Sequence, residues 1–193
     1  MPATSLDPRT ALVVIDLQRG ISQYPTIHPF PQIVANTARL AVAFRAARLP
    51  VVLVTVSFSA DGADRLTPRS EVPPRPLPAS PDFSKLVPEL GPWEGDLLIT
   101  KRHWGAFHGT ELDLQLRRRK ITGLLLTGVA TSIGVDTTAR EAHQLGYNLT
   151  FATDAITDVD PAAHQFVTQK IFPRIGELDS TDAVLALLAA RAG

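Results

Sequence analysis

Five short runs of apolar, β-prone residues recur along the chain, and longer segments with helical periodicity separate them. The runs are Ala11–Ile15, Val51–Val56, Asp96–Thr100, Thr122–Thr127 and Asn148–Ala152. Hydrophobic residues at consecutive positions, rather than alternate ones, indicate strands that are covered on both faces. Strands of this kind, joined by helices, form parallel sheets with helices on both faces. The sequence therefore predicts an α/β fold of the doubly wound, Rossmann-like type.

The intervening segments carry helix boundaries and apolar stripes. The predicted helices are Pro31–Arg48, Thr110–Arg119, a third from Ile133 or Gly134 to Gln144, a fourth over about Ala162–Ile171, and a last one capped by Ser180. Pro50 ends the first of them, and Gly146 is placed to cap the third. The basic run Arg117–Lys120 is interpreted as a solvated helix end whose charges oppose the helix dipole.

Composition limits the classes of function. With 193 residues, of which 45% are hydrophobic, the chain is long enough for one α/β domain, which we expect to span residues 1–193. Lys and Arg together number 19, as do Asp and Glu, so no overall charge favours nucleic acid or an anionic membrane. The chain has no Cys, which excludes disulfides, thiolate metal sites and thiol nucleophiles. No signal peptide or membrane-spanning run is recognisable, and we expect a soluble cytoplasmic protein.

The segment Phe58–Pro81 differs from the rest of the chain. It is rich in Pro, carries Arg65, Arg69 and Arg75, and has little apolar patterning. Such a segment is expected to be an ordered surface excursion that borders a site, or else a contact with another subunit.

Two charged residues directly follow predicted strands. Asp16 ends the run Val13–Ile15, and Lys101 ends the run Leu97–Thr100. Each has an ordinary alternative, a turn acid for Asp16 and an edge lysine for Lys101. Ligands bind at the carboxyl ends of parallel strands, and a buried carboxylate and ammonium within about 4 Å of each other offset part of their desolvation cost. We therefore expect Asp16 and Lys101 to form a pair at a functional site.

A third element lies at the same predicted edge. Thr127–Gly134 is a strand end followed by small residues and a helix start, so its N–H groups are suited to an oxyanion or a carboxylate. It lacks the glycine spacing of a phosphate loop. An ordinary tight strand-to-helix turn remains the alternative.

Together these residues resemble the isochorismatase-like hydrolases over nearly the whole chain. The resemblance is carried by Val14–Gln18, Lys101–Phe107, Gly128–Thr131, Thr138–Ala142 and Thr153–Ala155. It implies a three-layer fold with a six-stranded parallel sheet, a cis peptide bond at Val129–Ala130, and a homo-oligomer, either a dimer or a tetramer. Amidases of this family use an Asp-Lys-Cys triad that maps onto Asp16, Lys101 and Gly134.

Gly134 stands where those amidases carry the nucleophile, so the chain resembles a Gly-containing branch that lacks the catalytic Cys. Isochorismatases also carry Gly there and cleave a vinyl ether without a covalent intermediate. The resemblance gives Asp16 the role of general acid or base. Lys101 would orient Asp16 or bind a substrate carboxylate, and Gly134 would leave room for water or substrate. The segment Ala130–Ser132 departs from the Tyr-Ala-His of true isochorismatases, which removes support for isochorismate itself as the substrate.

The remaining site predictions concern the walls of the pocket. The candidate substrate-binding residues are Gln18, Phe58, Trp104, Phe107, Val129, Ala130, Thr131 and Ile133. No cofactor is expected, and no metal site, because the five His have no recognised metal-ligand spacing. The predicted function is hydrolysis of a small carboxylated molecule without a thiol intermediate. The alternative is a catalytically silent member that binds a metabolite or acts as an assembly module.

Overall fold

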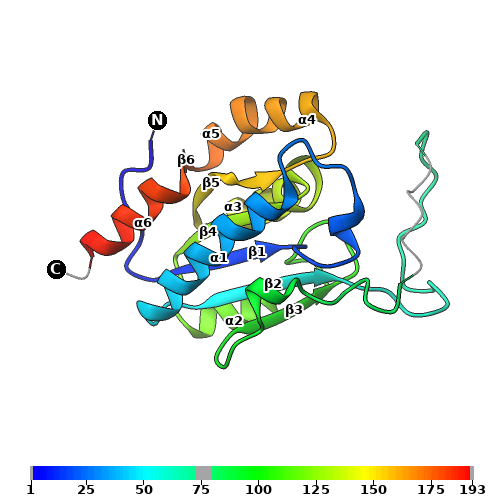
Figure 1. Cartoon of the computed structure of the whole chain (residues 1–193), viewed down its shortest axis with the longest axis horizontal. Coiled ribbons are helices and arrows are strands. Elements are labelled where there is room, and N and C mark those ends of the chain that lie inside the picture. Colours follow the sequence, from blue (N-terminus) through cyan, green and yellow to red (C-terminus); the bar gives the residue numbers. More distant parts are fainter. Residues whose placement is uncertain (1, 73–79, 192–193) are drawn as a thin grey trace.

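A six-stranded parallel sheet forms the centre of the molecule. The computed structural model describes residues 2–72 and 80–191. The strand order is β3-β2-β1-β4-β5-β6, with every neighbouring pair parallel (Figure 1). The strands are β1 (Thr10–Ile15), β2 (Val51–Val56), β3 (Leu97–Lys101), β4 (Gly123–Val129), β5 (Asn148–Thr157) and β6 (Glu177–Asp179). The predicted α/β fold with a six-stranded parallel sheet is confirmed.

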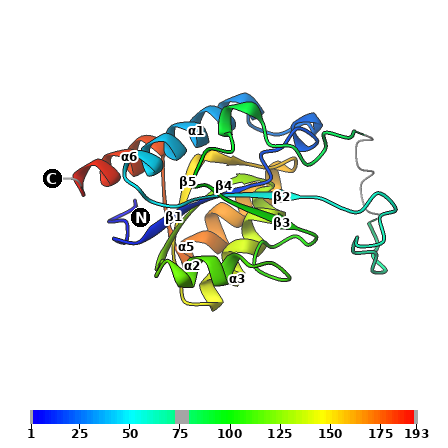
Figure 2. The same ribbon diagram turned by 90° about the horizontal axis from the view of Figure 1, so that it is seen from below.

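Helices cover both faces of the sheet. Figure 2 shows α1 (Phe30–Ala46) and α6 (Thr181–Ala190) on one face, and α2 (Leu112–Arg118), α3 (Asp136–Gln144) and α5 (Phe172–Ile175) on the other. The short helix α4 (Pro161–Phe166) follows β5. Three layers therefore enclose two cores, as the doubly wound prediction requires.

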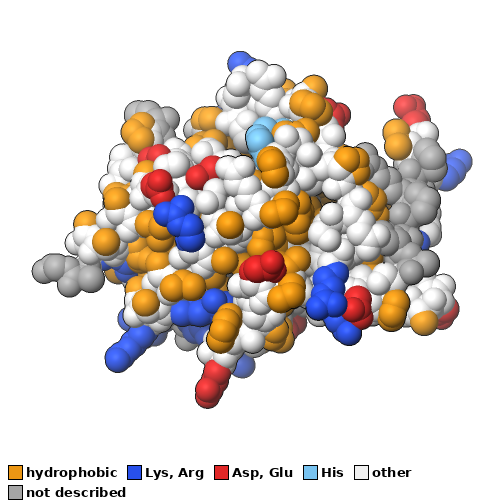
Figure 3. Space-filling model, viewed as in Figure 1, with side chains coloured by type: hydrophobic (Ala, Val, Ile, Leu, Met, Phe, Trp, Pro, Cys, Tyr) orange, Lys and Arg blue, Asp and Glu red, His pale blue; other side chains and the backbone are white. Residues whose placement is uncertain are grey.

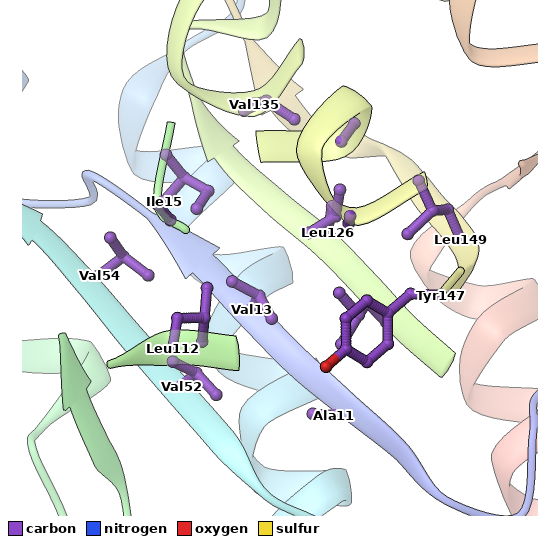
Figure 4. Packing of buried hydrophobic residues seen from close by; sticks show 14 of the residues in the cluster. Ala11, Val13, Ile15, Val52, Val54, Leu112, Leu126, Val135, Tyr147 and Leu149 are labelled. Carbon is purple, nitrogen blue, oxygen red and sulfur yellow. The ribbon is translucent and has the colours of Figure 1, made fainter. Parts of the chain in front are cut away.

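The consecutive apolar residues of the strands divide between these two cores. On β1, Val13 and Ile15 point into the cluster under α2 and α3 (Figure 4), whereas Leu12 and Val14 join the cluster under α1 and α6. All four are fully buried. Side chains alternate between the faces of a strand, and each buried aliphatic side chain contributes roughly 1.5–3 kcal/mol. Burial on both faces thus makes β1 a rigid support for whatever follows Ile15.

Two elements differ from the sequence prediction. The strand β6 has only three residues, Glu177–Asp179, and gave no apolar run that could be recognised. The helix predicted over Ala162–Ile171 is instead α4, a π-helical turn at Val167–Ile171, and then α5. Pro173 lies in the first turn of α5, where a missing N–H is tolerated.

The excursion predicted at Phe58–Pro81 leaves the sheet after β2 and projects away from it (Figure 1). Its part at residues 73–79 lies outside the described residues. The chain returns along the segment after β1, where Arg19 N–H donates to Lys85 O (2.8 Å) and Gly20 N–H donates to Phe83 O (3.0 Å). The base of the excursion is therefore attached at the edge of the sheet where β1 and β2 end.

The surface carries charges of both signs. On the face shown in Figure 3, Lys and Arg side chains are interspersed with Asp and Glu around a hydrophobic stretch. Within the described ranges, no helix has the length and apolar character needed to cross a membrane. That residues 1–193 form a single domain stays a prediction.

Candidate active site

Asp16 and Lys101 meet at the carboxyl edge of the sheet. Asp16 follows β1, Lys101 ends β3, and β2 lies between them and pairs Val56 with Lys101. The Lys101 Nζ lies 2.8 Å from Asp16 Oδ2, and both side chains are less than a tenth exposed. The buried ion pair expected from the two strand ends is present.

The Lys101 ammonium also donates to two backbone carbonyls. Its Nζ lies 3.2 Å from the carbonyl oxygen of His103 and 3.0 Å from that of Trp104. An ammonium has three hydrogens, and Asp16 and these two carbonyls use all three. Of the two roles predicted for Lys101, this geometry supports the orientation of Asp16 and leaves no donor for a substrate carboxylate.

The Asp16 carboxylate has one oxygen with no partner. Oδ2 accepts from Lys101, whereas Oδ1 is buried and makes no hydrogen bond to any described residue. Burial raises the pKa of Asp16 above its ordinary value. The Lys101 ammonium opposes that rise, as does the nearby Val56 N–H, whose own hydrogen bond goes to Gln18 Oε1 at 2.8 Å. Asp16 also has a left-handed backbone, with φ of 54°, a conformation that Asp tolerates better than most residues. This carboxyl group is thus held apart from water, and one of its oxygens has no hydrogen-bond partner among the described residues.

Glycines bring the next strand end close to Asp16. Gly128 has φ of 120°, and a Cβ there would collide with the carbonyl oxygen of Ile15. Gly134 has more space, because its Cβ would lie 3.2 Å from Asp16 Oδ2 and 3.1 Å from Ile15 Cγ2. A side chain at position 134 would therefore begin beside the carboxylate.

The turn that carries Gly134 follows β4 directly. The Val129–Ala130 peptide bond is cis, and Thr131–Val135 forms a π-helical turn, η3, before α3. The Ala130 carbonyl accepts from the N–H groups of Ile133 and Val135 (both 3.1 Å). These two N–H groups are engaged within the turn and do not contribute to the anion-binding face expected there.

Asp158 holds the same turn from β5, and sequence reasoning missed it. It is 1% exposed, and its Oδ2 accepts from Ser132 N–H at 2.6 Å. Its Oδ1 accepts from the N–H groups of Val159 (2.7 Å) and Asp160 (3.2 Å). A charge-assisted bond of this kind fixes the turn strongly. The sequence prediction ended this strand at Ala152, whereas β5 continues to Thr157, so no signal in the sequence marked Asp158.

Gln18 has a different role from the one predicted. Its Nε2 donates to the carbonyls of Val56 (3.0 Å) and Phe83 (2.8 Å), and its Oε1 accepts from Val56 N–H at 2.8 Å. The side chain is fully buried. Its amide thus ties the end of β2 and the returning excursion together, and is not directed at a ligand.

Trp104 and Phe107 do not lie together on a pocket wall, as was expected of two substrate-binding residues. Phe107 is 8% exposed, belongs to the core under α2 and α3, and lies 5.8 Å from the Tyr147 ring, whereas Trp104 is 62% exposed. The exposure of the two side chains differs because the loop bends between Trp104 and Phe107. Phe58 lies under the Arg65 guanidinium, 5.4 Å from it, at the start of the excursion.

The other predicted pocket residues lie around the turn. Val129 and Thr131 are buried, Ala130 is partly exposed, and Ile133 is 38% exposed. Thr131 Oγ1 lies 2.9 Å from His164 Nδ1, and the rings of His164 and His28 are 5.1 Å apart. This His pair was not predicted. Burial lowers the pKa of His164.

Elsewhere in the described residues, no candidate metal site is found, and two cavities lie apart from this edge. Across residues 2–72 and 80–191, no group of three or more His, Asp or Glu side chains is arranged to hold a metal ion. Two cavities of about 380 and 590 Å³ lie at the amino-terminal ends of the strands, and none of their lining residues belongs to the candidate site.

Comparison with known proteins identifies the family. The sequence profile of the Isochorismatase domain matches residues 10–183. The chain belongs to the isochorismatase family. An uncharacterized isochorismatase family protein of Bacillus subtilis, YwoC, is 46% identical over 181 residues, which cover 92% of this chain and 93% of that protein. The structure of an isochorismatase family protein from Burkholderia thailandensis superposes with a TM-score of 0.92 at 45% identity, covering 96% of this chain and 98% of that one.

Members with a named activity are more distant. An N-carbamoylsarcosine amidase from Arthrobacter is 29% identical over 192 residues, covering 94% of this isochorismatase-family chain and 72% of the amidase. The family is one of hydrolases that act on small molecules, and this chain is a hydrolase of that family. Its assignment to a branch that lacks the Cys stays a prediction.

Proposed function

We propose that this isochorismatase-family hydrolase acts on a small carboxylated substrate without a covalent thiol intermediate, with Asp16 as its general acid and base. The observation that carries the proposal is the buried Asp16 Oδ1, which has no partner while Oδ2 is fixed by Lys101. A general acid needs a proton at a free, oriented oxygen and a pKa raised toward neutrality. Burial of Asp16 acts in that direction.

The substrate class that we propose is an enol ether of pyruvate, because the isochorismatases that this chain resembles also carry Gly at position 134 and cleave a vinyl ether. Asp16 Oδ1 carries the proton and delivers it to the terminal methylene carbon, which leaves an oxocarbenium centre at the neighbouring carbon. Water adds there and returns a proton to Asp16. Cleavage of the carbon–oxygen bond then releases pyruvate and an alcohol, so that one water is consumed. General acid catalysis of this kind contributes about 10²–10⁴-fold.

Gly134 and Lys101 support this chemistry in different ways. Gly134 offers no nucleophile, and it avoids the crowding that a Cβ 3.2 Å from Asp16 Oδ2 would bring beside the carboxylate. Lys101 orients the Asp16 carboxylate and is its counter-ion. Val129, Ala130, Thr131 and Ile133 are the substrate-binding residues that we retain from the sequence prediction.

The test compares wild-type protein with Asp16→Asn on a panel of pyruvate enol ethers that includes isochorismate, with pyruvate release as the readout. Asp96→Asn is the matched control, because the Asp96 side chain is also buried and paired, with Arg45 at 2.8 Å, but lies directly before β3. We expect Asp16→Asn to lose at least about 100-fold in kcat/KM. Asp96→Asn should keep its activity.

Equal rates for wild type and Asp16→Asn would refute the role of Asp16. If the wild type releases no pyruvate from any member of the panel while small carboxylates raise its melting temperature, the enol ether proposal fails in favour of a metabolite-binding protein. We also propose a homo-oligomer, a dimer or a tetramer, which light scattering after size-exclusion chromatography tests directly. The cytoplasmic location expected from the sequence stays a prediction.

A further inference from the structure

The loop after β3 donates two backbone hydrogen bonds to side chains of helix α3. Ala106 N–H donates to Thr138 Oγ1 at 3.1 Å, and Phe107 N–H donates to Glu141 Oε2 at 3.1 Å. Thr138 and Glu141 are three residues apart on α3 and so lie on one side of it. Gly105 fits between these contacts because a Cβ there would collide with the Glu141 carboxylate. Two successive N–H groups of the loop are thus bound by one helix.

Thr138 also reaches the turn that carries Gly134. Its Oγ1 donates to the Gly134 carbonyl oxygen at 2.6 Å while it accepts from Ala106 N–H. Thr138 is 0% exposed, so neither bond competes with water. Threonine hydroxyls within helices commonly bond the carbonyl four residues earlier. The bond from Ala106 is different, because it joins a loop 32 residues away in sequence.

The same loop positions the Lys101 ammonium. The carbonyl oxygens of His103 and Trp104 accept from Lys101 Nζ, and that Nζ binds Asp16 Oδ2. A displacement of the loop therefore moves two of the three acceptors of the ammonium. The chain of contacts runs from Thr138, through Ala106 and the loop carbonyls, to Lys101 and Asp16.

We propose that Thr138 is a positioning residue of the site, whose hydroxyl fixes both the loop that aims Lys101 at Asp16 and the turn that carries Gly134. The segment Trp104–Phe107 then serves to hold Lys101 in place, and does not bind substrate as was expected of Trp104 and Phe107. The inference rests on the proposed function only where it predicts an effect of Thr138 on turnover. The effect of Thr138 on the pKa of Asp16 is measurable without any substrate.

The test uses Thr138→Val, which keeps the shape of the side chain and removes the hydroxyl, and Thr138→Ser, which keeps the hydroxyl. Thr37→Val is the matched control: Thr37 is also a fully buried helical threonine, and its hydroxyl has no partner among the described residues. The pKa of Asp16 is followed in each protein by carboxyl ¹³C NMR, with Asp16→Asn used to assign the signal. Hydrogen exchange of the Ala106 amide shows whether its bond to Thr138 Oγ1 has been lost.

We expect the pKa of Asp16 to rise in Thr138→Val, because Lys101 lowers it and is less well held. Thr138→Ser and Thr37→Val should titrate as the wild type does, and exchange at Ala106 should accelerate at least tenfold in Thr138→Val alone. If Thr138→Val does not fold, Glu141→Ala, which removes the acceptor of Phe107 N–H, carries the same expectation for Asp16. An unchanged or lower pKa of Asp16 in the folded variant would overturn the inference, as would an equal rise in Thr37→Val.

The result separates this inference from the proposed function. A protein that hydrolyses no enol ether but shows the shift in Thr138→Val would retain the positioning role while the proposed function fails. Where turnover is found, the pH profile of kcat should move with the pKa of Asp16, and Thr138→Ser should restore it. An active wild type with no such movement in Thr138→Val would refute the positioning role and leave the function intact.

Discussion

Replacing Lys101 by Met leaves the Asp16 carboxylate buried without its counter-ion. At 2.8 Å and an effective dielectric constant of about 20, the attraction within the pair is about 6 kcal/mol, and burial of each ion costs several kcal/mol. Removing one partner of such a pair typically costs about 3–5 kcal/mol. The carbonyls of His103 and Trp104 also lose their donor. We therefore expect Lys101→Met to lower the free energy of unfolding by about 3–5 kcal/mol near neutral pH.

The loss should depend on pH in a defined direction. Burial raises the pKa of Asp16 in the folded state, so its contribution to stability is complete below the unfolded pKa and is lost as pH rises through the folded pKa. Without Lys101 the folded pKa rises further, because the ammonium was the group that lowered it. The destabilisation by Lys101→Met should thus be smaller at about pH 5.5 than at about pH 8.

Urea unfolding followed by circular dichroism, at both pH values, measures this difference. For a protein of this size, about 3–5 kcal/mol corresponds to a fall of roughly 6–20 °C in melting temperature. The double variant Asp16→Asn/Lys101→Met removes both charges and should be more stable than Lys101→Met at the higher pH. A loss below about 1 kcal/mol that is equal at both pH values would show that the pair is not energetically coupled as argued.

Two further substitutions probe the backbone around the site. Gly128→Ala should lower the free energy of unfolding by about 3 kcal/mol or more, or prevent folding, because its Cβ would collide with Ile15 O. Gly146→Ala is also at positive φ but has open space around it, and should cost only about 1–2 kcal/mol. Comparable melting temperatures for the two variants would contradict the close approach of Gly128 to Ile15. Asp158→Asn should lower the free energy of unfolding by about 1–3 kcal/mol, because the charge-assisted bond to Ser132 N–H is lost. Asp182→Asn, at an exposed carboxylate, is the control in the same urea titration. An Asp158→Asn protein as stable as the wild type would show that Ser132 N–H is satisfied in another way.

The pairing of Asp16 with Lys101 was predictable because it depends on topology alone. Parallel strands end at one edge of a sheet, so a charged residue directly after each of two nearby strands must lie at that edge. The strands β1 and β3 flank β2, which brings the two side chains within reach. Most helix and strand positions followed from hydrophobic periodicity. The exceptions are β6, which has only three residues, and the helix predicted over Ala162–Ile171, which a π-helical turn interrupts.

The residues that hold the pair in place were not predictable in this way. Thr138 and Asp158 act through hydrogen bonds to loops 32 and 26 residues away in the chain, and those loops have no periodic pattern. Gln18 and Phe107 were expected to face substrate because they stand beside Asp16 and Lys101 in sequence. In the structure the Gln18 side chain instead hydrogen-bonds the backbone of Val56, and the Phe107 ring packs near that of Tyr147. Both contacts depend on how the chain bends after β1 and β3, which the sequence does not reveal.

Position 134 decides which chemistry the retained pair can perform. A Cβ there would lie 3.2 Å from Asp16 Oδ2 and 3.3 Å from the Val129 carbonyl oxygen, so a nucleophilic side chain at this position would begin beside the carboxylate. With Gly, the mechanism that we propose has Asp16 act on the substrate or a water molecule directly. Oδ2 is already bound to Lys101, which leaves Oδ1 to exchange a proton with that group. Under the proposed mechanism, the absence of the thiol leaves proton transfer to the carboxyl group of Asp16, and a buried oxygen without a partner is the feature that such a role requires.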